Sequence, residues 1–322
     1  MYGELASSLR HIADAVGTQI NFNKRKLGLL CDRLDDGIAP DPIAFSKYYL
    51  LVNALMTDDL RRATTLLDEI TKISGMPERS VVALGQDLDE DHSALYASMI
   101  EEDEPARLDV VPPSPAAISA FQPVFAEATE LIEAATPAMA DEIEGLARQI
   151  ILVGQGSGRE SMFDGGSHFQ IWNALFLNID RPRSRIEMAE VIVHECAHSL
   201  LFGFCIDETL TSNRDDNLYS SPLREDLRPV DGIYHAAFVS ARMYWLMAQL
   251  MESSLLNEKE MAEAARSLER DRRNFEEGYS VVAEHGLLTK TGKGLMAGAR
   301  SFMDAAHARR QEQPSWSPKD AS

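Results

Sequence analysis

At residues 191–201 the chain reads VIVHECAHSLL. His194 and His198 stand four positions apart, and Glu195 follows the first histidine directly. Positions i and i+4 of an α-helix lie about 40° apart around its axis and one turn apart along it, so both imidazoles can reach one ion. The apolar residues on both sides predict a buried helix from Ser184 through Phe202. Buried histidines and a glutamate are costly unless something satisfies them, and a metal ion does so directly. The alternative is a pair of core histidines capped by hydrogen bonds.

The third candidate ligand is His235, near the start of a second helix expected over about residues 232–255. The intervening loop is long enough to bring this helix antiparallel to the first. Arg242 lies seven residues after His235, about two turns on and about 20° off the same face. A guanidinium about 10 Å along the helix from a metal ligand is well placed to hold a carboxylate that reaches towards the metal. Pairing of Arg242 with a core carboxylate is the alternative.

The motif indicates a metal but leaves the reaction open. One interpretation is a zinc peptidase in which Glu195 acts as general base on a zinc-bound water. The downstream sequence fits that class poorly, because a metzincin requires Gly at 201 and His at 204, where this chain has Leu201 and Phe204. A second interpretation is an oxygenase, and a third is a non-catalytic, peptide-binding or structural metalloprotein.

The rest of the chain predicts a mostly helical α+β protein. We expect a helical N-terminal region at 1–110, a metal-dependent catalytic domain with a small sheet at 111–310, and a disordered tail at 311–322. Helical patterns cover 44–73, with Thr57-Asp58-Asp59 as a cap between two helices, and then 116–147, 258–285 and 288–310. Residues 85–104 hold eight carboxylates and no Lys or Arg, which favours an exposed connector. Strands are expected at 149–153 and 167–179, and the glycine cluster at 154–158 is expected to form a turn.

The charge balance excludes two classes of partner. The formal net charge is −20, whereas nucleic-acid binding requires a positive surface. The same charge disfavours adhesion to an anionic membrane, and no stretch reaches the roughly 20 apolar residues needed to cross a bilayer. The three cysteines are an odd number at no metal-binding spacing, and the chain begins without a secretory signal. We therefore expect a cytoplasmic protein.

Around the motif the chain resembles a known family. The residues that carry the resemblance are HECAH at 194–198, YSSPLREDLRP at 219–229 and GIYHAAFV at 232–239. They are similar to the HExxH-motif proteins associated with ribosomally made peptide natural products, described as 2-oxoglutarate- and Fe(II)-dependent peptide β-hydroxylases. The likeness is specific over about 190–242, diffuse over 149–298 and absent from 1–110, and Leu227 stands where the family usually has a proline.

The resemblance implies a ligand set and a substrate. His194, His198 and His235 are the implied Fe(II) ligands, and Arg224, Arg228 or Arg242 is the implied clamp for the distal carboxylate of 2-oxoglutarate. Three neutral imidazoles leave the Fe(II) charge at +2, which the dianionic co-substrate balances, so Glu195 is free to orient a ligand or a water. The implied reaction uses O2 to hydroxylate the β-carbon of a residue in a precursor peptide.

Overall fold

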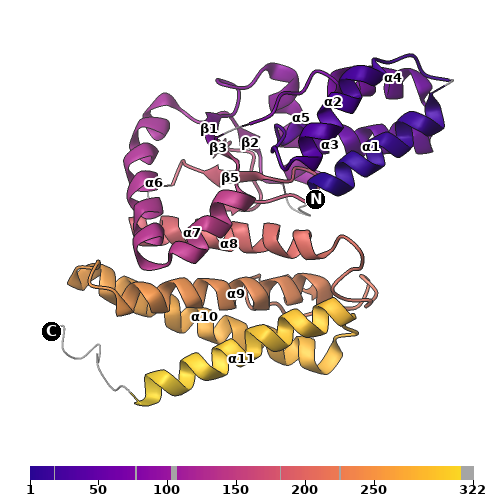
Figure 1. Ribbon diagram of the computed structural model, residues 1–322. Coiled ribbons are helices and arrows are strands. Elements are labelled where there is room, and N and C mark those ends of the chain that lie inside the picture. Colours follow the sequence, from indigo (N-terminus) through magenta and orange to yellow (C-terminus); the bar gives the residue numbers. More distant parts are fainter. Residues whose placement is uncertain (18, 77, 103–106, 182, 225, 313–322) are drawn as a thin grey trace. The chain divides into compact units, whose positions relative to one another are not determined.

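A computed structural model describes residues 1–17, 19–76, 78–102, 107–181, 183–224 and 226–312 (Figure 1). Helices account for 62% of the structure and strands for 9%, which confirms the mostly helical α+β class. The chain folds into two compact units. Unit 1 comprises residues 1–121 and 142–182, and unit 2 comprises residues 122–141 and 183–322. Each unit thus combines two separate stretches of chain, and neither corresponds to the contiguous regions expected on either side of residue 110.

Unit 1 begins with helices. Their bounds are α1 Tyr2–Val16, α2 Lys24–Asp35, α3 Ile43–Met56, α4 Leu60–Ile70 and α5 Glu90–Glu102. The expected cap between α3 and α4 is present, because the Asp59 side chain accepts a hydrogen bond from the Arg62 amide at 3.0 Å. Asp58 takes the left-handed conformation (φ 58°) that turns the chain between the two helices. The prediction of two helices joined at this point is confirmed.

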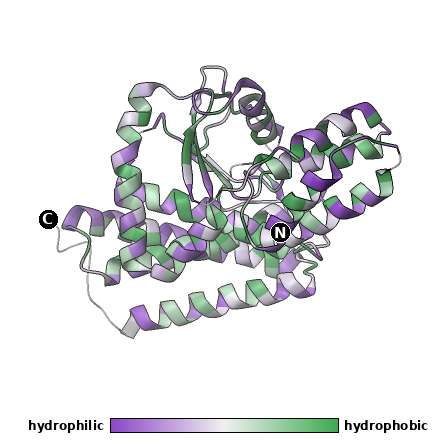
Figure 2. Cartoon of the chain, turned by 45° about the horizontal axis from the view of Figure 1, so that its top comes forward, coloured by the Kyte–Doolittle hydropathy of each residue, from purple (hydrophilic) through white to green (hydrophobic). Residues whose placement is uncertain are grey.

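A small mixed sheet forms the other part of unit 1. Its strands are β1 Ser80–Ala83, β2 Val110–Val111, β3 Gln149–Gln155, β4 Gly165–Gly166 and β5 Ala174–Asn178. The order is β1-β3-β5-β4, with β1, β3 and β5 parallel and β4 antiparallel to β5, while β2 pairs antiparallel with the end of β3. Every residue of β3 and β5 is buried, as expected of central parallel strands covered on both faces. Most helices instead carry both hydrophobic and hydrophilic residues (Figure 2).

Three expectations for unit 1 were wrong. Residues 90–102 form α5 and not a connector, because Tyr96, Met99 and Ile100 pack into the core beside the sheet despite the acidic composition. The strand expected at 167–179 begins only at Ala174, after a turn closed by the bond from the Ile171 amide to the His168 carbonyl. The region expected to be wholly helical contains β1, whose four residues were too few to give a period in the sequence.

The glycine cluster at 154–158 surrounds a carboxylate of the chain itself. The Gly156 amide donates to the Asp109 carbonyl and the Gly158 amide to Asp109 Oδ2, both at 2.8 Å. A Cβ at Gly156 would lie 2.1 Å from Asp109 Oδ2, so any larger residue there would displace the Asp109 carboxylate. This loop follows β3 as expected, and its amides are occupied by Asp109.

Unit 2 is built from helices and a two-stranded sheet. Their bounds are α6 Pro115–Ala135 and α7 Pro137–Leu146, which unit 2 shares with unit 1, then α8 Arg185–Phe204, β6 Leu218–Tyr219, β7 Arg228–Pro229, α9 Val230–Glu252, α10 Glu258–His285 and α11 Lys290–Glu312. In Figure 1, α9 runs alongside both α8 and α10. Gln311 and Glu312 complete α11, and the remainder of the predicted tail, 313–322, lies outside the described residues. In the part of the chain described, no helix is long and apolar enough to cross a membrane.

Candidate metal centre

The helix α8 begins at a capping box. The Ser184 hydroxyl accepts a hydrogen bond from the Glu187 amide at 3.1 Å, and the Glu187 carboxylate accepts one from the Ser184 amide at 3.2 Å. The Arg185 guanidinium then forms a two-point ion pair with Glu260 of α10 at 2.8 and 3.0 Å. The first turn of α8 is therefore fixed to α10. This contact sets the rotation of α8 about its axis, and so the directions in which His194, Glu195 and His198 point.

His194 and His198 present the same nitrogen to a common point. Their Nε2 atoms lie 3.2 Å apart. Metal–nitrogen bonds of about 2.1 Å that meet at an angle between tetrahedral and octahedral values put two ligand nitrogens about 3.0–3.4 Å apart. The spacing between the two imidazoles therefore suits one shared ion.

Glu195 lies beside this pair. Its Oε1 atom is 3.9 Å from His194 Nε2, and its side chain is only 8% exposed. A carboxylate at that distance is too far to share a direct hydrogen bond with the imidazole, but one water can bridge the gap. Glu195 is thus placed to accept a proton from, or to orient, a water at the ion.

His235 of α9 joins the other two histidines, but it faces the opposite edge of His198. The two rings stack at 5.3 Å between centroids, and their Nδ1 atoms lie 3.0 Å apart. The Nδ1 and Nε2 lone pairs of one imidazole point away from each other, so an ion on His198 Nε2 is out of reach of a ligand on the Nδ1 side. Accordingly, the described residues contain no set of three His, Cys, Asp or Glu side chains arranged around one ion. Binding through all three histidines requires the His235 ring to shift towards the Nε2 edge of His198.

The environment keeps two of these imidazoles neutral. Burial lowers the pKa of His198 well below its usual value, and the charges of His194 and His235 lower it further. Burial also lowers the pKa of His235, opposed by the Asp231 carboxylate one turn earlier on α9. Neutral imidazoles have the free lone pair that a metal requires, so this donor set fits Fe(II) or Zn(II) in its chemistry.

Of the three candidate clamps, two lie together and hold a carboxylate of the chain. Arg224 Nε is 3.2 Å from one oxygen of Asp226, and Arg228 Nε is 2.8 Å from the other. Burial acts to raise the pKa of Asp226, but the hydrogen bond from Arg224 and the charges of both arginines outweigh it and lower that pKa. Arg242 has a different environment, with its guanidinium carbon 4.8 Å from the centre of the Trp245 ring.

A buried charged network on the same helix was missed by sequence reasoning. Glu190, one turn before His194, accepts hydrogen bonds from Ser267 at 3.2 Å and from Arg270, both on α10. Asp271 is fully buried beside this pair, and within the described residues neither of its oxygens accepts a hydrogen bond. Burial raises its pKa to about 9, the Glu190 charge adds to the rise, and Arg270 opposes it. A sequence signal existed, because Asp271 interrupts an apolar stripe that includes Leu268 and Phe275.

Neither a protein-family model nor a curated protein gives a match to this sequence. The assignment of a function to this centre therefore depends on its own geometry and on the likeness of its motifs.

Proposed function

We propose that this protein is an Fe(II)- and 2-oxoglutarate-dependent oxygenase that hydroxylates the β-carbon of a residue in a ribosomally made precursor peptide. The observation that carries the proposal is the gathering of three imidazoles from α8 and α9, with the Nε2 atoms of His194 and His198 3.2 Å apart. Neutral nitrogen ligands leave the full charge of the metal to be balanced by an anionic co-substrate. Fe(II), when bound, supplies the activation of O2.

The residues of the chain divide the remaining tasks. His194 and His198 hold the metal from one face of α8, and His235 completes the set from α9 once its ring shifts towards the Nε2 edge of His198. Glu195 orients a ligand or a water beside the metal, since its carboxylate is buried 3.9 Å from His194 Nε2. Arg242 is our first choice for the 2-oxoglutarate clamp, because it lies about two turns beyond His235 on α9 and about 20° off the same face.

A zinc hydrolase is the second candidate. It is favoured by the position of Glu195, since a buried carboxylate within one water of the metal ligands is also what a general base for hydrolysis requires. The two candidates differ in their use of Fe(II), O2 and 2-oxoglutarate, and this difference can be tested before the peptide substrate is identified.

The test is an anaerobic titration of the Fe(II)-loaded protein with 2-oxoglutarate. We expect a visible charge-transfer band from chelation of Fe(II) by the keto acid, and succinate formation once air is admitted. Glu195→Gln should retain the band, and His235→Ala should lose both the band and most of the metal. His285→Ala, a histidine stacked on Tyr219, serves as the matched control and should behave as the wild type.

The same titration examines the clamp. Loss of the arginine leaves a buried carboxylate unpaired, at a cost on the order of 3–5 kcal/mol, so Arg242→Ala should weaken 2-oxoglutarate binding roughly 100-fold or more. Arg242→Lys should restore it only in part, because an ammonium lacks the two-point fork. The absence of any band, together with zinc-dependent peptide cleavage under argon that Glu195→Gln abolishes, would overturn the oxygenase in favour of the hydrolase.

A further inference from the structure

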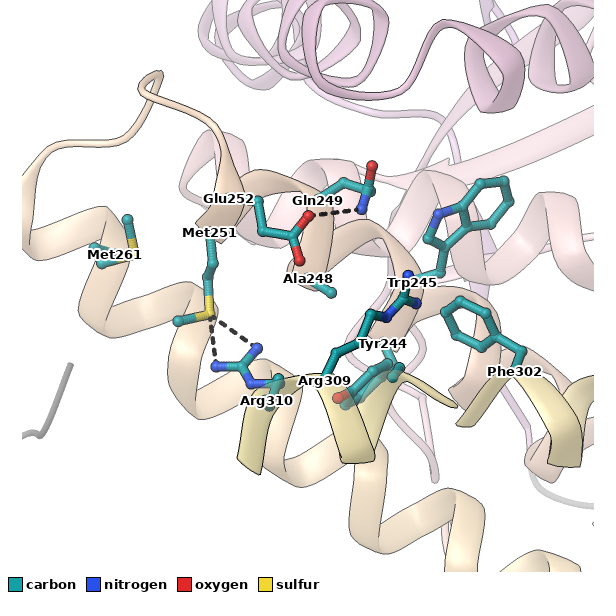
Figure 3. Close-up of a pocket in the computed structure, with 11 residues that line it drawn as sticks. Tyr244, Trp245, Ala248, Gln249, Met251, Glu252, Met261, Phe302, Arg309 and Arg310 are labelled. Atoms are coloured by element: carbon teal, nitrogen blue, oxygen red, sulfur yellow. Dashed lines mark hydrogen bonds between the residues drawn. The ribbon is translucent and has the colours of Figure 1, made fainter. Parts of the chain in front are cut away.

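Unit 2 contains a concave site formed by the C-terminal half of α9, the start of α10 and the C-terminal half of α11 (Figure 3). We call it the α9–α11 pocket. Its volume is about 560 Å³, within the range of small-molecule sites. It is lined by Tyr244, Trp245, Ala248, Gln249, Met251, Glu252, Met261, Phe302, Ala306, Arg309 and Arg310. Trp245 lies ten residues beyond His235, about 15 Å along α9. Its ring also contacts the Arg242 guanidinium at 4.8 Å, so the pocket adjoins the proposed clamp but lies away from the histidines.

One wall of the pocket is aromatic. The Phe302 ring lies 6.3 Å from both the Tyr244 and Trp245 rings, and it meets each edge to face. Such a wall offers ring faces and edges against which another flat apolar group can pack. Met251 and Met261 add flexible side chains that adjust to the shape of a ligand.

The pocket is also cationic, in a chain whose formal net charge is −20. Arg309 and Arg310 line it from the last turn of α11. Arg310 lies 3.9 Å from the Met251 sulfur, a weak acceptor, and within the described residues neither arginine forms an ion pair. Many other arginines of unit 2 contact a carboxylate, as Arg185 does with Glu260 and Arg300 with Glu276.

A third polar group, the Tyr244 hydroxyl, belongs to a residue that lines the pocket. Tyr244 is only 1% exposed as a residue. Burial raises the pKa of this hydroxyl, and the charges of Arg310, Arg272 and Arg309 oppose the rise, so the hydroxyl lies within the field of the two pocket arginines. A hydroxyl that lines the pocket can donate a hydrogen bond to an acceptor atom placed there.

From the aromatic wall, the two guanidinium groups and this hydroxyl, we propose that the α9–α11 pocket binds an aromatic carboxylate. The aromatic body packs against Trp245 and Phe302, and the carboxylate is held by Arg309 and Arg310, for which paired nitrogen donors are well suited. Glu252 also lines the pocket, and its carboxylate accepts a hydrogen bond from the Gln249 side chain at 3.3 Å. Its negative charge repels a ligand that carries a second carboxylate. Two sources supply this chemistry: a free aromatic acid, or the C-terminal residue of a peptide that ends in an aromatic side chain.

Calorimetric titration of the full-length protein with indole-3-propionate tests the proposal. We expect saturable binding of one equivalent, with and without metal. Indole-3-propionamide, which has the same shape without the charge, should bind at least tenfold more weakly. The double variant Arg309→Gln/Arg310→Gln should lose at least tenfold in affinity for the acid while keeping the thermal stability of the wild type. A peptide that ends in tryptophan is compared with the same peptide as its C-terminal amide. The tighter binder of indole-3-propionate and the peptide with a free carboxylate shows whether the natural ligand is a small aromatic acid or a peptide C-terminus.

The matched control is Arg266→Gln/Arg273→Gln, which removes the same charge from two exposed arginines of α10 and should leave binding unchanged. Trp245→Leu should weaken the acid and the amide alike, since it removes the aromatic wall and leaves the cations in place. The proposal is overturned by equal affinity for acid and amide, or by wild-type affinity in the Arg309/Arg310 variant. It is also overturned if binding appears only after removal of residues 313–322, because the pocket would then belong to the end of the chain.

Discussion

Asp271 has Glu190 and Arg270 as its charged neighbours and no contact with solvent. Two carboxyl groups and one guanidinium are neutral as a set only when one proton is bound, and the buried Asp271 is the group that holds it. Protonated, it can donate a hydrogen bond to Glu190, which in turn is held by Ser267 and Arg270. The protonated Asp271 carboxyl group therefore lies between α10 and α8, the helix that carries His194 and His198.

The proton on Asp271 predicts how stability depends on pH. The pKa of Asp271 is raised to about 9 in the folded protein, against about 3.9 when unfolded, so its contribution is fully present below pH ~4 and is lost as the pH rises through ~9. Between pH ~4 and pH ~9, each rise of one pH unit should lower the free energy of unfolding by up to about 1.4 kcal/mol, because the folded protein must keep Asp271 protonated while the unfolded chain does not. Asp271→Asn stays neutral, so it should be more stable than the wild type at pH ~8, and the difference should shrink towards pH ~5.

Urea unfolding in the presence of a chelator, at several pH values, measures this effect without the pH dependence of metal binding. Asp215→Asn, at an exposed position, is the control and should follow the wild type. Identical pH slopes for the wild type and Asp271→Asn would show that Asp271 is ionised in the folded state.

At the residue scale, the sequence predicted which side chains gather but not how they face one another. The helical spacing of His194 and His198 brings both Nε2 atoms to one point because that spacing is a local property of α8. The ring orientation of His235 depends on the packing of α9 against α8, which no local pattern encodes, and the structure places its Nδ1 against the wrong edge of His198 for a shared ion. Asp226 was likewise missed as the common partner of Arg224 and Arg228.

At the scale of elements, Glu260 has two functions at the start of α10. Its carboxylate accepts a hydrogen bond from the Asn257 amide at 2.9 Å, which completes a capping box, and it also pairs with Arg185 at the start of α8. Both members of the ion pair are largely buried, with 27% and 16% of their side chains exposed. One side chain therefore supports the first turns of two helices.

We predict that two variants distinguish the contribution of the capping box from that of the ion pair with Arg185. Glu260→Gln keeps an oxygen for the cap but loses the charge, and should lower the free energy of unfolding by about 1 kcal/mol. Glu260→Ala loses the cap as well, and should lower it by about 2 kcal/mol. Urea unfolding at neutral pH measures both, with the exposed Glu258→Gln as control. Equal stability of Glu260→Gln and the wild type would mean that the ion pair contributes nothing.

Elements with local signals were the ones that sequence reasoning predicted well. The start of α8 after Ser184 and the start of α10 after Asn257 follow from capping boxes that need only four consecutive residues. Helix α5 was missed because its acidic surface dominated its composition, whereas its position is fixed by a buried face against the sheet. The short strand β1 likewise exists because β3 pairs with it over four residues.

At the scale of the whole molecule, the formal net charge of −20 predicts a response to salt. Self-repulsion destabilises the folded chain, and added ions screen it. Raising NaCl from about 0.02 to about 0.5 M at neutral pH should raise the Tm, by roughly 2 °C or more for each kcal/mol of repulsion removed. Near pH 4.8, the isoelectric point of the sequence, the same change of salt should have little effect. A Tm that falls with salt at neutral pH would show that attractive ion pairs outweigh the repulsion.

The two-segment composition of each unit imposes an order on biosynthesis. The ribosome makes residues 122–141 before residue 142 begins the second segment of unit 1, and their own unit resumes only at residue 183. In the finished protein Ala128, Leu131, Ile132 and Met139 of this stretch are buried. At about 5–20 residues per second, the 41 residues from 142 to 182 take several seconds to synthesise. Until the chain continues past residue 183, it therefore carries an apolar helical segment without the larger part of its own unit.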